Sequence, residues 1–243
     1  MHLVAERRTA SRRRWLVSIT MIVVALAVLT AVSSASAAAN VAKAWGRNQD
    51  GQLGDGTTSG PEMCGSSLEG CSTTPIAVGS LSGVTAVSAG GNHGLALLEN
   101  GTVMAWGDNE RGQLGNGTTT SSDVPVAVSG LSGVAAISAG SSQSLALLSN
   151  GTVMAWGETP GNGTEKSDVP VAVSGLSGVV AIAAGGGGFD FSLALLSNGT
   201  VMAWGNDSEG QLGNGTTSFS PALEPVPVSG LSGVSAISAG DAH

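Results

Sequence analysis

The sequence predicts an all-β fold built from repeated units of four short strands, behind an N-terminal leader of different composition. The tripeptide AWG appears four times, and its tryptophans lie 61, 50 and 48 residues apart, at Trp45, Trp106, Trp156 and Trp204. The stretch SGLSGVAAISAGSSQSLALLSNGTVMAWG at 129–157 has a near copy at 174–205. Copies this similar must share one local structure, so the chain is a repeat protein. With 38 Gly, 42% hydrophobic and 11% charged residues, it has the composition of a folded chain.

Each unit contains four short runs that indicate strands. In the unit that ends in Trp156 these runs are VPVAV, VAAIS, LALL and TVMAW, each rich in apolar residues and bounded by Gly, Ser or Asn. The pair Asn150-Gly151 between the last two runs is typical of a two-residue hairpin turn, because both of its central residues need positive φ. The same turn recurs at Asn100-Gly101 and Asn198-Gly199.

Four short strands in a unit of about 50 residues, repeated around an axis, describe a β-propeller blade. Small residues, as in GVAAISAG, fit the strand that crowds the axis. Trp106, Met104 and their repeats would fill the wider space between blades. We therefore expect these large side chains to form the core rather than to contact a ligand.

Residues 1–39 have the layout of a secretory signal peptide. Five arginines between Arg7 and Arg14 precede an apolar run from Leu16 to Val32, and the small residues SSASAAA follow. Cleavage before Ala38 or Asn40 would leave a mature chain of about residues 40–243. The alternative is an uncleaved membrane anchor, for which the apolar run is at the short limit.

The leader predicts a secreted or cell-surface protein. The pair Arg12-Arg13, followed by Trp15 and Leu16, resembles a twin-arginine export signal, and ordinary Sec export is the alternative.

The exported part is distinctly acidic. Residues 40–243 carry 4 basic and 16 acidic residues, a net charge of −12. Repulsion from phosphate argues against nucleic acid and anionic membrane surfaces, and it favours a neutral or basic protein partner. Membrane contact is expected only through an uncleaved leader or through a C-terminal anchor beyond His243.

Both cysteines lie in an insertion, GPEMCGSSLEGC, that the other units lack. In an oxidising compartment Cys64 and Cys71 are expected to form a disulfide that stiffens this loop. A free pair or a metal site are the alternatives. A metal site is disfavoured because no His or further Cys lies nearby to complete the ligand set. No metal or cofactor is predicted.

In its closely spaced, repeated motifs the chain resembles the regulator of chromosome condensation family. The motifs are GxNxxGQLGNGTT, a Pro-Val strand, SGVxAIxAGxxHSLAL and NGTVxAWG, and the likeness covers residues 41–243. The resemblance implies a seven-bladed propeller. Some family members promote nucleotide exchange on a small GTPase. A secreted bacterial member that inhibits β-lactamase is similar in its AWG signature and covers its target enzyme with one propeller face.

Three departures from the family pattern stand out. The loop at 157–165 lacks the GQLG found at 112–115, and the position of the family's His holds Gln143 in one unit and Phe191 in the next. The chain also starts inside a unit, at VAKAWG, and stops inside another, at 238–243. About four blades are therefore expected here, as part of a longer protein. Closure of the chain on itself or through oligomers is the alternative, because an open arc exposes unpaired strand edges.

No catalytic residue is predicted. His93 and His243 occupy one repeat position and are interpreted as structural hydrogen-bonding groups. No Ser or Cys lies in a nucleophile motif. The run Gly185–Gly188 lacks the Gly-Lys-Ser/Thr of a phosphate loop and is expected to be a widened loop.

Candidate partner-binding residues lie in two loops. Phe189, Asp190 and Phe191 follow the glycine run, and the two phenylalanines are the expected exposed aromatics. Asp108, Glu110 and Arg111 belong to a set of charged turn residues that recurs in equivalent loops. Such acidic turns could attract a basic partner or Ca²⁺, although their spacing matches no 12-residue calcium loop.

The leading hypothesis is a secreted or surface-displayed, non-enzymatic propeller that presents its loops to a protein partner. The alternative is an enzyme with a carboxylate site at the channel mouth. Paired carboxylates with a raised pKa would favour the enzyme, and an exposed patch at Phe189 and Phe191 would favour binding. Guanine-nucleotide exchange, by family resemblance, ranks third because it conflicts with export.

Overall fold

The computed structural model describes residues 2–6 and 40–243. In these two ranges it contains sixteen β-strands in four antiparallel four-stranded sheets, which confirms the all-β prediction. No helix in the described part of the chain is long and apolar enough to cross a membrane. The apolar run Leu16–Val32 and the expected cleavage sites lie outside the described residues.

Three sheets are complete propeller blades whose strand order follows the sequence. Blade B consists of β5 (Val84–Ala89), β6 (His93–Leu98), β7 (Val103–Gly107) and β8 (Ser122–Ala127). Blade C consists of β9 (Val134–Ala139), β10 (Gln143–Leu148), β11 (Val153–Glu158) and β12 (Lys166–Ala172). Blade D consists of β13 (Val179–Ala184), β14 (Phe191–Leu196), β15 (Val201–Asp207) and β16 (Ser218–Pro227). The four strands predicted for each unit are therefore present.

Blade A is assembled differently. Its strands are β1 (His2–Glu6), β2 (Val41–Arg47), β3 (Glu62–Cys64) and β4 (Glu69–Ala77), in the spatial order β1-β2-β4-β3. His2 pairs with Trp45 of β2, as Ser144 of β10 pairs with Trp156 of β11. In its register β1 thus occupies the place of a second blade strand, and β3 comes from the cysteine-containing insertion.

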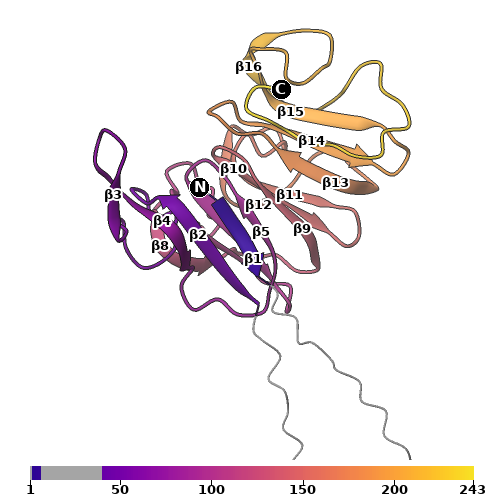
Figure 1. Ribbon diagram of the computed structural model, residues 1–243. Coiled ribbons are helices and arrows are strands. Elements are labelled where there is room, and N and C mark those ends of the chain that lie inside the picture. Colours follow the sequence, from indigo (N-terminus) through magenta and orange to yellow (C-terminus); the bar gives the residue numbers. More distant parts are fainter. Residues whose placement is uncertain (1, 7–39) are drawn as a thin grey trace, which may run out of the picture.

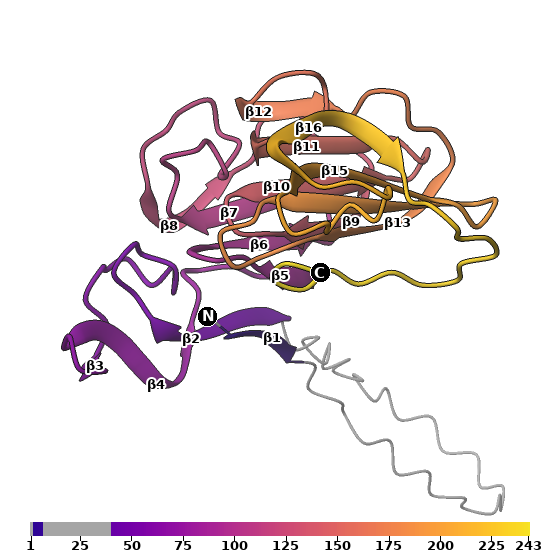
Figure 2. The ribbon, with the colours of Figure 1, turned by 90° about the horizontal axis from the view of Figure 1, so that it is seen from above.

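The four blades stand side by side in sequence order (Figures 1 and 2). The first strands of neighbouring blades, β5, β9 and β13, contact one another in turn. Because the strands alternate in direction, the loops from first to second strand and from third to fourth strand emerge at the same end of each blade. We name this end the loop face. The Asn-Gly hairpins lie at the opposite end.

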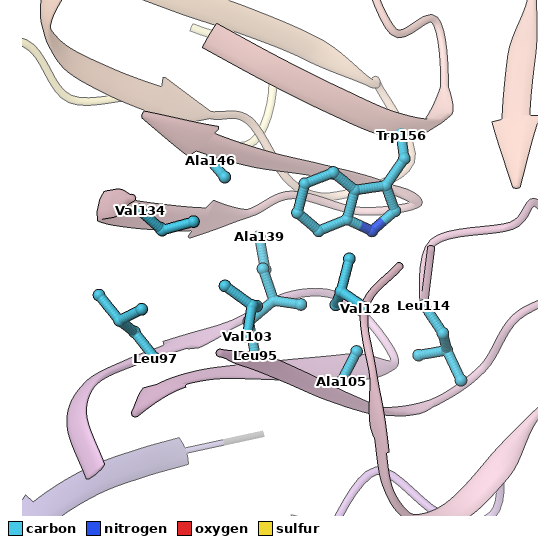
Figure 3. Packing of buried hydrophobic residues seen from close by; sticks show 10 residues of the cluster. All are labelled: Leu95, Leu97, Val103, Ala105, Leu114, Val128, Val134, Ala139, Ala146 and Trp156. Carbon is cyan, nitrogen blue, oxygen red and sulfur yellow. The ribbon is translucent and has the colours of Figure 1, made fainter. Parts of the chain in front are cut away.

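Tryptophans of the AWG repeats form the contacts between blades. Trp106, Trp156 and Trp204 are each 0% exposed. Trp156 of blade C packs against blade B, where Leu114, Val128 and Ala105 belong to the same apolar cluster (Figure 3). Its Nε1 donates a hydrogen bond of 2.8 Å to the carbonyl oxygen of Gln113. The predicted core role of these tryptophans is confirmed. We name the receiving surface of each blade its tryptophan slot.

The glycine that follows each tryptophan is required by a close backbone approach. Gly157 has φ of 84°, and a Cβ built there would lie 2.2 Å from the carbonyl oxygen of Ser142. A Cβ built at Gly107 or Gly205 would lie 2.3 Å from the equivalent carbonyl oxygen. A larger residue would be strained by its φ and would clash with the neighbouring strand, which explains why the motif is AWG.

His93 belongs to a buried chain of hydrogen bonds between blades B and C. Its Nε2 lies 2.8 Å from the Ser144 hydroxyl, which donates its own proton to the carbonyl oxygen of Gln113 at 2.9 Å. Nε2 of His93 must therefore carry the hydrogen. The other ring nitrogen, Nδ1, is buried with no hydrogen-bond partner among the described residues. Burial lowers the pKa of His93 to about 4, with a smaller opposing effect of Asp108, so the ring is neutral.

Candidate functional site on the loop face

The long loops between third and fourth strands are built around one buried polar residue. In blade B, Oδ1 of Asn109 accepts the Leu114 amide at 2.9 Å, and its Nδ2 donates to the carbonyl oxygen of Thr118 at 2.9 Å. Asn48 and Asp207 hold the leucine of their own loops in the same way. The Asn and the GQLG of the motif are therefore a scaffold that fixes the shape of the loop.

Blade C lacks this scaffold because its loop between Glu158 and Lys166 is shorter. Buried Thr159 stands there with a positive φ of 41°, an uncommon conformation for a residue with a side chain. Nε1 of Trp204, which packs on this blade, finds no hydrogen-bond partner in the described residues. The shortening thus removes one hydrogen bond between blades.

Arg111 links the long loop of blade B to the short loop of blade C. Its Nη1 lies 3.6 Å from Oε2 of Glu158, with both side chains partly exposed. The same Oε2 is shielded from solvent and accepts no hydrogen bond from the described residues. This ion pair is therefore the interaction that compensates the charge of Glu158.

Asp190 ties blade D to blade C. Its Oδ1 accepts a hydrogen bond of 2.7 Å from the Ser142 amide, 48 residues away in the chain. In the same widened loop the Gly188 amide donates to Oγ of Ser141 at 3.1 Å. The glycine run is thus a loop clamped onto the neighbouring blade.

Burial is the main reason that the pKa of Asp190 is raised, to about 6. The negative charge of Glu158 adds to this rise, whereas the Ser142 hydrogen bond and the Arg111 charge oppose it. Arg111, Glu158 and Asp190, one from each of three successive blades, therefore form one electrostatic cluster, which we name the loop-face cluster.

The other predicted charged residues stand beside this cluster. Oδ2 of Asp108 accepts a hydrogen bond of 2.9 Å from Gln113 Nε2, and its Oδ1 accepts the Glu110 amide at 3.0 Å. Asp108 therefore shapes its own loop, while Glu110 and Arg111 are exposed. Phe189 is half-buried on the loop face. Five of the six candidate partner-binding residues thus lie on one face.

The prediction that Phe191 is an exposed aromatic was wrong, because its side chain is only 1% exposed. It is the first residue of β14 and takes the buried place that His93 and Gln143 hold in blades B and C. The ring fills space beside Gly185, where a Cβ would meet it at 2.1 Å from Cε1.

Two features of this surface were missed in the sequence. Glu158 was not singled out, although the acid at the start of a shortened loop was a usable signal. Phe219, in β16, is 95% exposed. Its strand, β16, has ten residues where the equivalent β8 has six.

The cysteine-containing insertion forms the β3–β4 hairpin, which projects from blade A (Figure 1). Cys64 and Cys71 are paired, and their Cα atoms lie 5.9 Å apart, within the usual range for a disulfide. Backbone pairing of β4 with β2 attaches the hairpin to blade A, and the Arg47 guanidinium forms an ion pair with Glu69 at 2.9 Å beside it. Met63 and Leu68 on the hairpin are exposed. Among the described residues no three His, Cys, Asp or Glu side chains are grouped so that they could hold a metal ion.

Comparison with known families identifies these repeats. The family model of the regulator of chromosome condensation (RCC1) repeat matches residues 44–97, 100–147 and 198–243. A second family model of the same repeat matches 84–113, 134–163 and 179–211. The chain therefore belongs to the RCC1 repeat family, as its motifs suggested.

Individual relatives cover parts of the chain. Human protein RCC2 is 44% identical over 80 residues, which are 32% of this chain and 13% of that protein. The crystal structure of human WBSCR16 matches with a TM-score of 0.68 and 25% identity, over 84% of this chain and 51% of that one. Yeast RCC1 (Prp20), solved bound to Kap60, has a TM-score of 0.63 and 22% identity, over 77% of this chain and 44% of that one, which shows the fold alone. The chain thus spans about half of its structural relatives or less.

Proposed function

We propose that this chain is an exported, non-enzymatic propeller that binds a protein partner through its loop face. The loop-face cluster carries this proposal, because it joins side chains from three successive blades into one surface. A propeller holds such loops on rigid blades, so residues far apart in sequence act together. The net charge of −12 in residues 40–243 favours a basic or neutral partner.

Substitution of exposed loop-face residues is expected to weaken the partner complex. The variant Glu110→Ala, Arg111→Ala, Phe189→Ala should lower affinity by at least about 30-fold, the effect of losing one strong interface anchor. The matched control is Glu99→Ala, which removes an exposed charge in the hairpin at the opposite end of blade B. The measurement is the dissociation constant for a protein captured from the producer's extracellular fluid. Equal affinity of the triple variant and the wild type would sink the proposal.

Export is expected to remove the leader and to oxidise the hairpin cysteines. The intact mass of protein recovered from the medium and the envelope should be about 20 kDa, the chain without residues 1–39. It should increase by about 2 Da on reduction, as one disulfide opens. Removal of the leader would also remove β1 from the edge of β2. Uncleaved protein confined to the cytoplasm would contradict the export proposal.

A second candidate function is catalysis, and one observation favours it. Asp190 has a raised pKa beside Glu158, a combination found in general acid–base sites. Both carboxylates nevertheless have positioning contacts between blades, to the Ser142 amide and to Arg111. An enzyme would lose turnover in Asp190→Asn while keeping its partner affinity, whereas a binding protein would have no turnover to lose. Nucleotide exchange ranks below both, because no residue here is matched to that activity.

A further inference from the structure

The short loop of blade C lacks a particular part of the long loops. Asn48 and Thr159 are equivalent, because each is the third residue after the tryptophan of its AWG. Gly54 and Gly161 are equivalent as well, since a Cβ at either would lie 2.8 Å from the tryptophan of the next blade. Between these two points blade A has five residues, QLGDG's predecessors at 49–53, and blade C has Pro160 alone.

Two of those five residues face the start of the next blade's fourth strand. Gln49 and Asp50 of blade A line a pocket of about 410 Å³ together with Ser121 and Ser122 of blade B. Ser122 is the first residue of β8. The start of a fourth strand therefore lies against the long loop of the preceding blade. For the fourth strand of blade D that preceding loop is the short one of blade C, which has no counterpart of these residues.

At this place blade D carries an aromatic side chain. In β16 and β8, Val226 and Val126 pair with the third strand of their blades in the same register. By this register residues 222–227 of β16 correspond to β8, and residues 218–221 are an added segment at the loop-face end. Phe219 lies in the added segment and is 95% exposed. A loop is thus shortened and the strand that faces it is lengthened at one boundary between blades.

The backbone beneath Phe219 is held in place by blade C. The Gly163 amide of the short loop donates a hydrogen bond of 2.9 Å to the carbonyl oxygen of Leu223 in β16. The same loop begins after Glu158, which pairs with Arg111. Phe219 therefore stands on the loop face, on a strand tied to the loop that borders the loop-face cluster. A side chain on a fixed backbone loses little conformational entropy on binding.

Addition of a partner strand to the outer edge of β16 is disfavoured. Pro221, Pro225 and Pro227 lie in this strand and have no amide hydrogen to donate. Prolines on an edge strand prevent pairing with another chain. A partner at this boundary would therefore contact side chains, and Phe219 is the largest exposed one there.

The charges around Phe219 define the chemistry of the partner. Glu165 and Glu224 are exposed on the two segments that meet here, and Lys166 is the exposed base beside them. Glu224 lies close to the short loop, since a Cβ at Gly163 would be 3.5 Å from its Oε1. The acids outnumber the base, and the net charge of residues 40–243 has the same sign. Basic groups on a partner would complement this surface.

We propose that Phe219 is the main apolar anchor of the partner interface and inserts into an apolar pocket with a basic rim on the partner protein. This inference rests on the proposed binding through the loop face and adds the anchoring residue and the chemistry of its receptor. Aromatic side chains that become fully buried dominate most protein interfaces. Phe219 has more apolar surface to bury than the half-buried Phe189.

The first test places a photo-crosslinking phenylalanine analogue at position 219 of the full chain during export in the producing cell. We expect a crosslink to the same protein that the analogue reaches from position 189. The matched control is position 124, because Val124 is 45% exposed on the outer strand of blade B. Position 124 should give no crosslink to that protein.

The second test measures affinity, with the protein crosslinked from position 189 purified as the probe. Phe219→Ser should raise its dissociation constant by about 30-fold, the effect of losing an interface anchor. Val124→Ser should change it by less than about twofold, as for a residue outside the interface. Because Phe219 is so exposed, the circular dichroism melt of Phe219→Ser should match that of the wild type, which separates lost binding from lost folding.

The outcomes distinguish the anchor from loop-face binding itself. An unchanged dissociation constant for Phe219→Ser would overturn the anchor and leave loop-face binding standing. The same holds if position 189 captures a partner while position 219 captures nothing or a different protein. The absence of any crosslink from both positions would overturn the anchor and the proposed function together.

Discussion

Replacing Trp156 with alanine is expected to lower the free energy of unfolding by about 4 kcal/mol, the usual cost of truncating a fully buried tryptophan. The side chain is 0% exposed and joins blades B and C (Figure 3). Its removal would leave a cavity between the two sheets, and closely packed sheets can move together only partly to fill such a space. It would also remove the hydrogen bond to Gln113. Chemical denaturation followed by circular dichroism measures the change.

A pair of phenylalanine variants isolates the hydrogen bond from the packing. Trp156→Phe and Trp204→Phe remove the same atoms from equally buried positions, but only Trp156 loses a hydrogen bond. Trp156→Phe should therefore cost about 1 kcal/mol more than Trp204→Phe. Equal costs would show that the shortened loop of blade C does not affect its tryptophan slot.

The stability of the fold is expected to depend on two groups, buried His93 and partly buried Asp190, whose contributions respond to pH in opposite directions. The pKa of His93 is about 4 when folded and 6.5 when unfolded, so its contribution is complete above pH 6.5 and is lost as pH falls to 4. The loss is about 3 kcal/mol. The pKa of Asp190 is about 6 when folded and 3.8 when unfolded, so the fold gains stability as pH falls from 6 to 3.8. Because Asp190 is partly exposed, this gain is about 2 kcal/mol.

Two conservative variants separate the opposing responses. His93→Gln places there the residue that blade C has at the same position, Gln143, and it should gain stability relative to the wild type as pH falls below 6.5. Asp190→Asn keeps an oxygen for the Ser142 amide and should lose stability relative to the wild type over pH 6 to 4. Urea unfolding at pH 7.5, 5.5 and 4 measures both differences. Differences that stay constant with pH would contradict the assigned protonation states.

Much of the fold was predictable because each repeat carries the same turn residues and the same packing residues. The Asn-Gly turns fix the hairpins through positive φ, and the AWG glycine is the only residue that fits beside the Ser142 carbonyl or its equivalents. The periodic tryptophans predicted the core between blades, because a large apolar side chain that recurs in every unit indicates a buried position that recurs in every blade. Strand number and order in blades B to D followed directly.

The candidate site was harder to predict because it depends on contacts between units. Phe191 was expected at the surface on the basis of the adjoining glycine run, but its register in β14 places it in the core. The pairing of Arg111 with Glu158 depends on how far a loop of one blade reaches across the next. No local sequence pattern indicates how far that loop reaches. The pairing of β1 with β2 also joins residues separated by more than thirty positions, without any repeat signature in β1.

The most direct test of the central claim, binding through the loop face, is site-specific crosslinking during export in the producing cell. A photo-crosslinking phenylalanine analogue would replace Phe189 on the loop face and, as a control, Glu99 at the opposite end of the blade. Our account predicts that position 189 yields a discrete crosslink to one external protein and that position 99 does not. A crosslink from position 99 with none from position 189 would contradict the account.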